Sequence, residues 1–213
     1  MNIKSATFLF LVFISFITGY SQKQDSILKR NPEEMKDKMI PSFSRISLSG
    51  KSWNNDSLKG KVTLFSFWYI GCMPCMREIS LLNKLYREYG NQKDFVLLSM
   101  APQIQEDLSL FNNDSVKNVF SRVRMFFHTE PIEYEIIPTC DVHGTRKDTT
   151  NFYLMPECEN IVKDFKVWGY PQIFISDKQG LIRFVHGGFP LEPSAFDFIF
   201  NLYKTEIDEL LKN

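Results

Sequence analysis

Two nearly continuous apolar runs stand out in the pattern of hydrophobic and polar positions along the chain. Residues 62–70 and 95–100 combine β-branched, aromatic and aliphatic side chains with almost no polar interruption. Strands that are buried on both faces have this composition, whereas half-buried strands alternate between apolar and polar positions. The two runs therefore predict central strands of a sheet.

Helical and alternating patterns surround these runs. Apolar side chains recur at three- and four-residue steps from Ile79 to Tyr89, and Gly90 ends the pattern. Further helices are predicted over residues 116–123, with a cap among 113–115, and over 161–165 and 196–210. Alternation predicts an edge hairpin over 40–53, a strand over 132–136, and a hairpin of 172–176 and 181–185 around the turn 177–180. Strands that alternate with helices predict an α/β fold with a mixed central sheet flanked by helices.

The first 21 residues have the pattern of a secretory signal peptide. A single charge, Lys4, precedes an apolar run over residues 6–17, and the small residues Gly19 and Ser21 follow. An uncleaved membrane anchor is the alternative, although a bilayer span needs about 20 apolar residues. We expect a signal peptide (1–21), a polar linker (22–38) and one domain (39–213), with a periplasmic or other extracytoplasmic location.

Composition and charge narrow the classes of function. The 213 residues are 44% hydrophobic and 23% charged, which is typical of a soluble globular protein. Lys and Arg total 25 and Asp and Glu also total 25, so no basic field attracts nucleic acid. We predict no cofactor, no metal and no nucleic-acid partner.

Cys72 and Cys75 carry the clearest chemical signal, because they lie between a predicted buried strand and a predicted helix. The free N–H groups and the positive dipole at a helix start stabilise an anion, and therefore a Cys72 thiolate. In such motifs the pKa of the first cysteine falls from about 8.5 into the range of about 3.5–7.5. Cys75 lies about one helical turn later, close enough to attack a mixed disulfide on Cys72. Pro74 occupies the first turn, where its missing N–H costs nothing.

Other interpretations of this pair remain open. A structural disulfide that closes so short a loop would remove little chain entropy. Cys140 and His143 could complete a zinc site with Cys72 and Cys75, although the spacing is unusual for zinc. Two buried free thiols are a third possibility, which an oxidising compartment disfavours.

Two segments together resemble the thioredoxin fold, and most closely the exported TlpA/ResA-like thiol–disulfide oxidoreductases. Residues 66–78 read SFWYIGCMPCMRE, and residues 169–177 read GYPQIFISD. The similarity covers about residues 41–211, with an N-terminal hairpin and an extended central insertion at about 102–160. It implies protein thiol and disulfide substrates and a membrane or periplasmic electron donor. It also implies a role as a reductant, as in cytochrome c maturation or antioxidant maintenance of periplasmic thiols.

The same resemblance implies roles for individual residues. Cys72 corresponds to the nucleophile and Cys75 to the resolving thiol. Pro171 corresponds to a proline whose bond to the preceding residue, here Tyr170, is cis. Trp68 corresponds to the aromatic residue on the active-site strand. Glu78 corresponds to an acid that assists proton transfer; the alternative is a solvated carboxylate that complements the helix dipole.

Three positions depart from the family pattern. Ser66 stands where many thioredoxins carry a buried Asp, which leaves Glu78 as the candidate proton acceptor. Gly71 stands where a Trp is common, and Ser80 stands where a Pro often bends the helix.

Cys140 and Cys158 form a second candidate pair, 18 positions apart, inside the predicted insertion. We expect a structural disulfide, which by chain entropy would contribute roughly 3 kcal/mol. A second redox pair that exchanges electrons with Cys72 and Cys75 is the alternative, although no helix start activates either thiol.

Two further functions compete with the oxidoreductase. A peroxiredoxin-like peroxidase would need a Pro and a Thr where this chain has Phe65 and Tyr69. The second competing function is that of a binding module whose cysteine pair is not catalytic. The three histidines, His128, His143 and His186, lack metal-ligand spacing among themselves and are interpreted as surface or packing residues.

Overall fold

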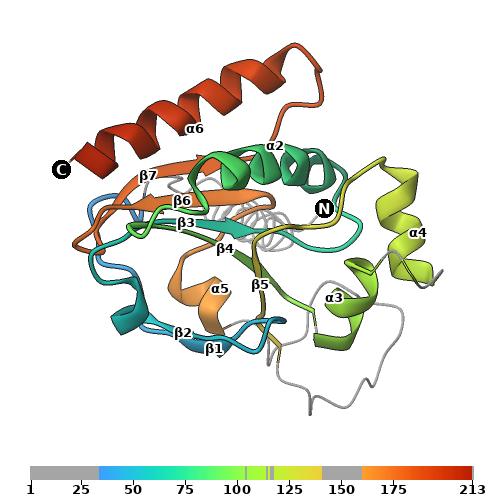
Figure 1. Ribbon diagram of the computed structural model, residues 1–213, viewed down its shortest axis with the longest axis horizontal. Coiled ribbons are helices and arrows are strands. Elements are labelled where there is room, and N and C mark those ends of the chain that lie inside the picture. The colour runs from blue at the N-terminus through green and yellow to red at the C-terminus, as the bar shows by residue number, and fades with distance from the viewer. Residues whose placement is uncertain (1–33, 104, 114, 116–117, 141–159, 213) are drawn as a thin grey trace, which may run out of the picture. The chain divides into compact units, whose positions relative to one another are not determined.

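A five-stranded mixed sheet forms the centre of the computed structural model (Figure 1). The structure describes residues 34–103, 105–113, 115, 118–140 and 160–212, and residues from Met35 onward group as one unit. The strand order is β5-β4-β3-β6-β7, where β3 to β5 are parallel and β6 and β7 are antiparallel to their neighbours. The strands are β3 (Val62–Phe67), β4 (Phe95–Ala101), β5 (Glu135–Pro138), β6 (Gln172–Ser176) and β7 (Ile182–Gly187). The predicted α/β class with a mixed sheet is confirmed.

Strand β3 is buried along its whole length, as its apolar run predicts. Its alternate side chains face two separate cores. Leu64 packs in the core that contains α2 (Met73–Tyr89) and α6 (Ala195–Lys212), whereas Phe65 and Phe67 pack in the core of the opposite face. Ser66 shares the α2 side with Leu64, because side chains alternate along a strand.

The opposite face is covered by smaller elements. They are the short helix α5 (Asn160–Asp164), the hairpin of β1 (Ser44–Ile46) and β2 (Ser52–Asn54), and the 3-10 helix η1 (Asn55–Leu58). Figure 1 shows α2 and α6 on one side of the sheet, and α5 with the hairpin on the other. Phe165, which follows α5, packs against Phe65 and Phe67 with tilted rings, whose centroids are 5.1 and 5.0 Å away. The predicted hairpin is confirmed with shorter strands, but it forms a separate two-stranded sheet and is not at the edge of the central sheet.

Between β4 and β5 the chain forms helices α3 (Gln105–Phe111) and α4 (Val119–Phe126). The sequence does not predict α3, because only Leu108 and Phe111 bury apolar side chains in a helix of 7 residues. The cap of α4 was expected among residues 113–115. Asn118 takes that role instead, and its side chain accepts the N–H groups of Phe120 and Ser121.

Strand β5 begins later than the alternation of Ile132, Tyr134 and Ile136 predicts. The side chain of Asn83 bonds the carbonyl of Pro131 and the N–H of Glu133, and Asn112 bonds both backbone groups of Ile132. Backbone groups that are taken by side chains do not pair with a strand, so this segment enters the sheet only at Glu135.

The predicted signal peptide, most of the linker and residues 141–159 of the predicted insertion lie outside the described residues. In the part of the chain that the structure describes, no helix combines the length and the apolar character needed to cross a bilayer.

Candidate active site

The residues that the sequence predicts to be functional lie together at one edge of the sheet, where the parallel strands end. The carboxyl ends of the parallel strands β3, β4 and β5 lie there, with the start of β6 and the end of β7. Cys72 follows β3, Pro171 precedes β6, and Cys140 follows β5. Ligand sites of open α/β sheets form at this edge.

Cys72 and Cys75 are joined by a disulfide at the start of α2, with their Cα atoms 5.2 Å apart. Cys72 is the N-cap of the helix, and its Sγ accepts the N–H of Cys75 at 3.3 Å. Pro74 lies in the first turn, as the sequence predicts. Both residues are buried, Cys72 at 4% exposure and Cys75 at 1%. A thiolate at this position would receive both an N–H donor and the positive end of the helix dipole.

The loop before β6 lies next to this turn. The Tyr170–Pro171 bond is cis, as the resemblance implies, and the carbonyl of Pro171 accepts the N–H of Gly188 at 2.8 Å. The Tyr170 ring contacts the ring of Tyr69, with centroids 5.3 Å apart. The two segments on either side of the disulfide are therefore packed together through these tyrosines.

Trp68 anchors the segment between β3 and the cysteines. It is buried, its indole Nε1 donates a hydrogen bond to the Ser99 hydroxyl on β4, and its ring lies 5.2 Å from the ring of Phe111. The strand was expected to continue to Ile70, but it ends at Phe67, so Trp68 begins the loop that carries Cys72.

Glu78 is buried in the α2 side of the core, at 1% exposure, and is not a solvated carboxylate. It lies one helical turn after Cys75, so the two side chains share the buried face of α2. The Tyr203 hydroxyl donates to Glu78 Oε1 at 3.4 Å, and the Ser66 side chain also bonds the carboxyl group. Burial raises the pKa of Glu78 to about 8, although the bonds from Tyr203 and Ser66 oppose the rise.

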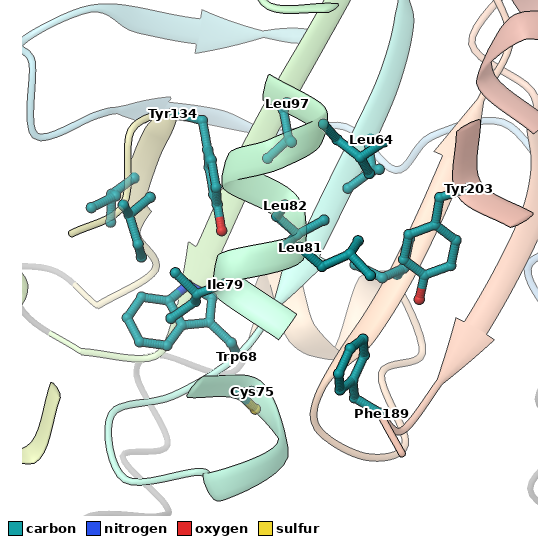
Figure 2. Close-up of a cluster of buried hydrophobic side chains, with 14 of the residues drawn as sticks. Leu64, Trp68, Cys75, Ile79, Leu81, Leu82, Leu97, Tyr134, Phe189 and Tyr203 are labelled. Atoms are coloured by element: carbon teal, nitrogen blue, oxygen red, sulfur yellow. The ribbon is translucent and has the colours of Figure 1, made fainter. Parts of the chain in front are cut away.

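Two tyrosines near Glu78 were not anticipated from the sequence. Tyr203 belongs to α6, and Tyr134 lies just before β5. Figure 2 shows them on either side of α2, with their hydroxyl groups pointing toward the end of the helix that carries Cys75. Burial, followed by the charge of Glu78, raises the pKa of both hydroxyls well above the ordinary value. Both tyrosines therefore stay protonated at neutral pH, and Tyr203 is the one that donates to Glu78.

An apolar groove of about 200 Å³ runs beside the first turns of α2. Its walls come from α2, from the end of α4 and from the segment after β7; they include Met76, Phe127, Phe189, Pro193 and Phe196. Two large apolar side chains near it are open to solvent, Met73 at 47% and Phe126 at 76%. The rings of Phe126 and Phe127 are in contact, at 5.1 Å, so this surface continues from the groove.

The remaining candidates are placed as follows. Cys140 is buried and disulfide-bonded. Cys158 and His143 lie outside the described residues, so the Cys140–Cys158 disulfide stays a prediction. His186 is a packing residue on β7 that contacts Glu206, with Nε2 2.8 Å from Oε2. His128 follows α4 with φ 52, a conformation used in turns.

Comparison with known families and proteins gives consistent results. The profile of the AhpC/TSA family matches residues 37–185. Thioredoxin-like protein YneN of Bacillus subtilis is 25% identical over 180 residues, which cover 84% of this chain and 87% of YneN. The thiol–disulfide oxidoreductase ResA of Bacillus cereus is 31% identical over 81 residues, 38% of this chain and 46% of ResA. The aligned part therefore spans less than half the length of ResA.

Solved structures share the fold. A proposed protein disulfide isomerase from Bacteroides thetaiotaomicron superposes with a TM-score of 0.56 and 18% identity, over 84% of this chain and 91% of that one. A thiol–disulfide isomerase from Corynebacterium glutamicum gives a TM-score of 0.52 and 17% identity, over 83% and 97% of the two chains. The thioredoxin-like fold expected from the sequence is confirmed.

Proposed function

Because this chain belongs to the AhpC/TSA family of thioredoxin-like proteins, we propose that it is an extracytoplasmic thiol–disulfide oxidoreductase that reduces protein disulfides. One observation carries the proposal: a disulfide at a helix N-cap, where the sulfur of Cys72 accepts a backbone N–H. This geometry stabilises the thiolate that disulfide exchange requires.

The reaction begins from the reduced protein. The Cys72 thiolate attacks one sulfur of a substrate disulfide, so a Cys72–substrate bond forms and the other substrate sulfur leaves as a thiolate. Cys75 then loses its proton and attacks Cys72, which re-forms the Cys72–Cys75 bond and releases the second substrate sulfur. Two electrons pass from the protein to the substrate, and a separate donor must restore the two thiols.

Glu78 is the proposed proton acceptor for Cys75 in the second step. It shares the buried face of α2 with Cys75, and its pKa of about 8 is close to the usual thiol value of about 8.5. Proton transfer between groups of similar pKa has little free-energy cost. Ser66 occupies the position of the usual buried Asp, which leaves Glu78 as the proposed acid of the site.

The burial of the site also bears on the direction of electron flow. The helix N-terminus favours a thiolate, which would stabilise the reduced protein and make it an oxidant. Cys72 and Cys75 are both buried, however, and burial disfavours a charged sulfur, which limits the stabilisation of the reduced form. We therefore assign the reductant role, with a reduction potential near the ~−270 mV of thioredoxin and far from the ~−120 mV of strong oxidants.

Protein substrates suit the apolar groove beside α2. A polypeptide that reaches Cys72 passes the exposed Met73 and can place an apolar side chain against Phe127 and Phe196. The N-terminal segment with signal-peptide character supports an extracytoplasmic location, where a membrane or periplasmic donor would supply electrons. Trp68, Pro74, Tyr170 and Pro171 are the proposed supporting residues of the site.

Trapping tests this function directly. A Cys75→Ser variant should accumulate mixed disulfides with protein partners, because Cys72 attacks but nothing resolves the bond. These adducts should disappear on reduction and should be absent from the Cys72→Ser variant, which is the matched control. Equal adduct levels in the two variants would contradict the assignment of Cys72 as nucleophile.

A peroxide assay separates the peroxidase alternative. With Phe65 and Tyr69 in place of the Pro and Thr of peroxidases, the reduced protein should consume hydrogen peroxide no faster than a simple dithiol. Rapid, Cys72-dependent consumption would instead make the protein a peroxidase.

A further inference from the structure

The hydroxyl group of Tyr203 reaches Glu78 from a distant part of the chain. The two residues are 125 positions apart, on α6 and α2, and both are buried. The bond from the hydroxyl to Oε1 is long, at 3.4 Å. It is nevertheless a hydrogen bond through which helix α6 reaches the proposed proton acceptor.

The Tyr203 ring is held from its other side. The ring of His186 on β7 lies 5.1 Å from it at an interplanar angle of 39°. The Nε2 atom of His186 is 3.0 and 2.8 Å from the two carboxylate oxygens of Glu206, one turn after Tyr203 on α6. This cluster joins β7 to α6 and limits the movement of the Tyr203 ring.

We propose that Tyr203 is a positioning residue for disulfide exchange, whose hydroxyl holds the Glu78 carboxyl on the side of α2 that carries Cys75. This inference rests on the proposed function and extends it to a residue that does not touch the reacting sulfurs. Before the proton transfer, the Tyr203 hydroxyl stabilises the Glu78 carboxylate by donating a hydrogen bond to it. Cys75 then gives its proton to Glu78, and Tyr203 itself stays protonated throughout.

Several groups face Glu78 and contribute to its titration. Tyr203 approaches from α6, Tyr134 from the segment before β5, and Ser66 from β3. The disulfide of Cys72 and Cys75 on α2 is uncharged in the oxidised protein. The Tyr134 hydroxyl has no hydrogen-bond partner among the described residues, so Tyr203 is the tyrosine that donates to the carboxyl.

The test measures the titration of Glu78 in the oxidised protein by NMR of ¹³C-labelled glutamate, with the signal assigned from Glu78→Gln. The wild-type midpoint should lie near a pKa of about 8. In Tyr203→Phe it should rise by about half to one pH unit, because a donor to the carboxylate is lost. Tyr89→Phe is the matched control. It removes another hydroxyl between α2 and α6, one that donates to Asp208, and should leave the midpoint unchanged.

An unchanged or lowered midpoint in Tyr203→Phe would overturn the proposal. Should that variant fold poorly, the Tyr203 Cζ signal of the wild type gives a second measurement. It should change at the same midpoint as Glu78 and lose that change in Glu78→Gln, and a signal insensitive to Glu78 would also overturn the proposal.

The pH profile of disulfide exchange tests the proposed function separately. If Glu78 accepts the Cys75 proton, the inflection in the rate should move upward in Tyr203→Phe together with the NMR midpoint. If the NMR midpoint of Glu78 shifts in Tyr203→Phe but the pH profile of the exchange rate does not, the result supports the positioning of Glu78 by Tyr203. The same result refutes the proton transfer from Cys75 to Glu78.

Discussion

At the scale of single residues, the buried carboxyl of Glu78 links stability to chemistry. Its pKa is raised from 4.5 to about 8, mainly by burial, so the folded protein holds a proton that the unfolded chain releases above about pH 4.5. For an acid with a raised pKa, stability falls as pH rises between the unfolded and folded values. Wild-type stability should therefore decrease from about pH 4.5 to about pH 8 through this residue.

The Glu78→Gln variant should remove this loss, because the amide does not ionise. Below pH 4.5 the two proteins should be similarly stable. At pH 8 the variant should gain up to about 5 kcal/mol relative to wild type, by 1.36 kcal/mol for each pKa unit. Urea denaturation at pH 4.5, 6, 7 and 8 measures the difference. A difference that stays constant with pH would show that Glu78 is ionised throughout this range.

The sequence predicts the cysteines of this site better than it predicts the surroundings of Glu78. Cys72 at the helix start follows from local signals, namely an apolar strand, a proline and a helical repeat. The burial of Glu78 depends on Tyr203 and Tyr134, which belong to segments far along the chain. A carboxylate in a first helical turn fits either a solvated or a buried position, so periodicity alone does not separate the two.

At the scale of elements, Asn83 joins α2 to the segment before β5. It is fully buried, and it bonds the carbonyl of Pro131 at 2.8 Å and the N–H of Glu133 at 3.1 Å. Asn83→Ala should lower the free energy of unfolding by about 2–4 kcal/mol, because two backbone groups lose their partners. Denaturant unfolding gives the value.

Arg87→Ala is the control for this prediction. It acts on the same two segments through exposed ion pairs with Glu130 and Glu133, which solvent screens. It should cost clearly less than Asn83→Ala. Equal losses would indicate that the ion pairs, and not the buried amide, connect the two segments.

The loop that carries Pro171 depends on the absence of a side chain at Gly187. A Cβ atom there would overlap Cζ2 of Trp168, in the segment that leads to Pro171. Gly187→Ala should therefore displace the Trp168 ring, cost about 1–3 kcal/mol, and slow disulfide exchange. Gly169→Ala in the same loop meets no atom within 4 Å and is the matched control. Thermal unfolding and an insulin-reduction assay measure both effects, and equal behaviour of the two variants would contradict the prediction.

The elements that the sequence predicts less well share a physical cause. Helix α3 has few apolar side chains to mark it, and its packing against α4 and β5 supplies the stability that its sequence lacks. The start of β5 is delayed by Asn83 and Asn112, whose amides compete with strand pairing. Both features arise from contacts between distant segments, whereas the strongly apolar strands β3 and β4 are determined locally.

At the scale of the whole molecule, redox state and folding stability are coupled. The stability of the oxidised protein minus that of the reduced protein equals the stabilisation of the Cys72–Cys75 disulfide on folding. In a reductant, the folded protein is more stable with the disulfide formed. In a strong oxidant, the folded protein is more stable in the reduced form, with the cysteine as a thiolate. Because burial of Cys72 and Cys75 disfavours a thiolate, the oxidised form should be the more stable one.

Comparison of the two forms in guanidinium chloride at pH 7 tests this expectation. Limited treatment with dithiothreitol, followed by alkylation and mass spectrometry, must show that only Cys72 and Cys75 are reduced and that the Cys140 disulfide is intact. Each 30 mV by which folding lowers the reduction potential should appear as about 1.4 kcal/mol of additional stability in the oxidised form. A Cys72→Ser/Cys75→Ser variant supplies a reduced-like protein without thiolates, and it should be at least as stable as the reduced wild type. A reduced form more stable than the oxidised form would reverse the assigned direction, because the helix N-terminus would then outweigh the burial of the cysteines and the protein would act as an oxidant.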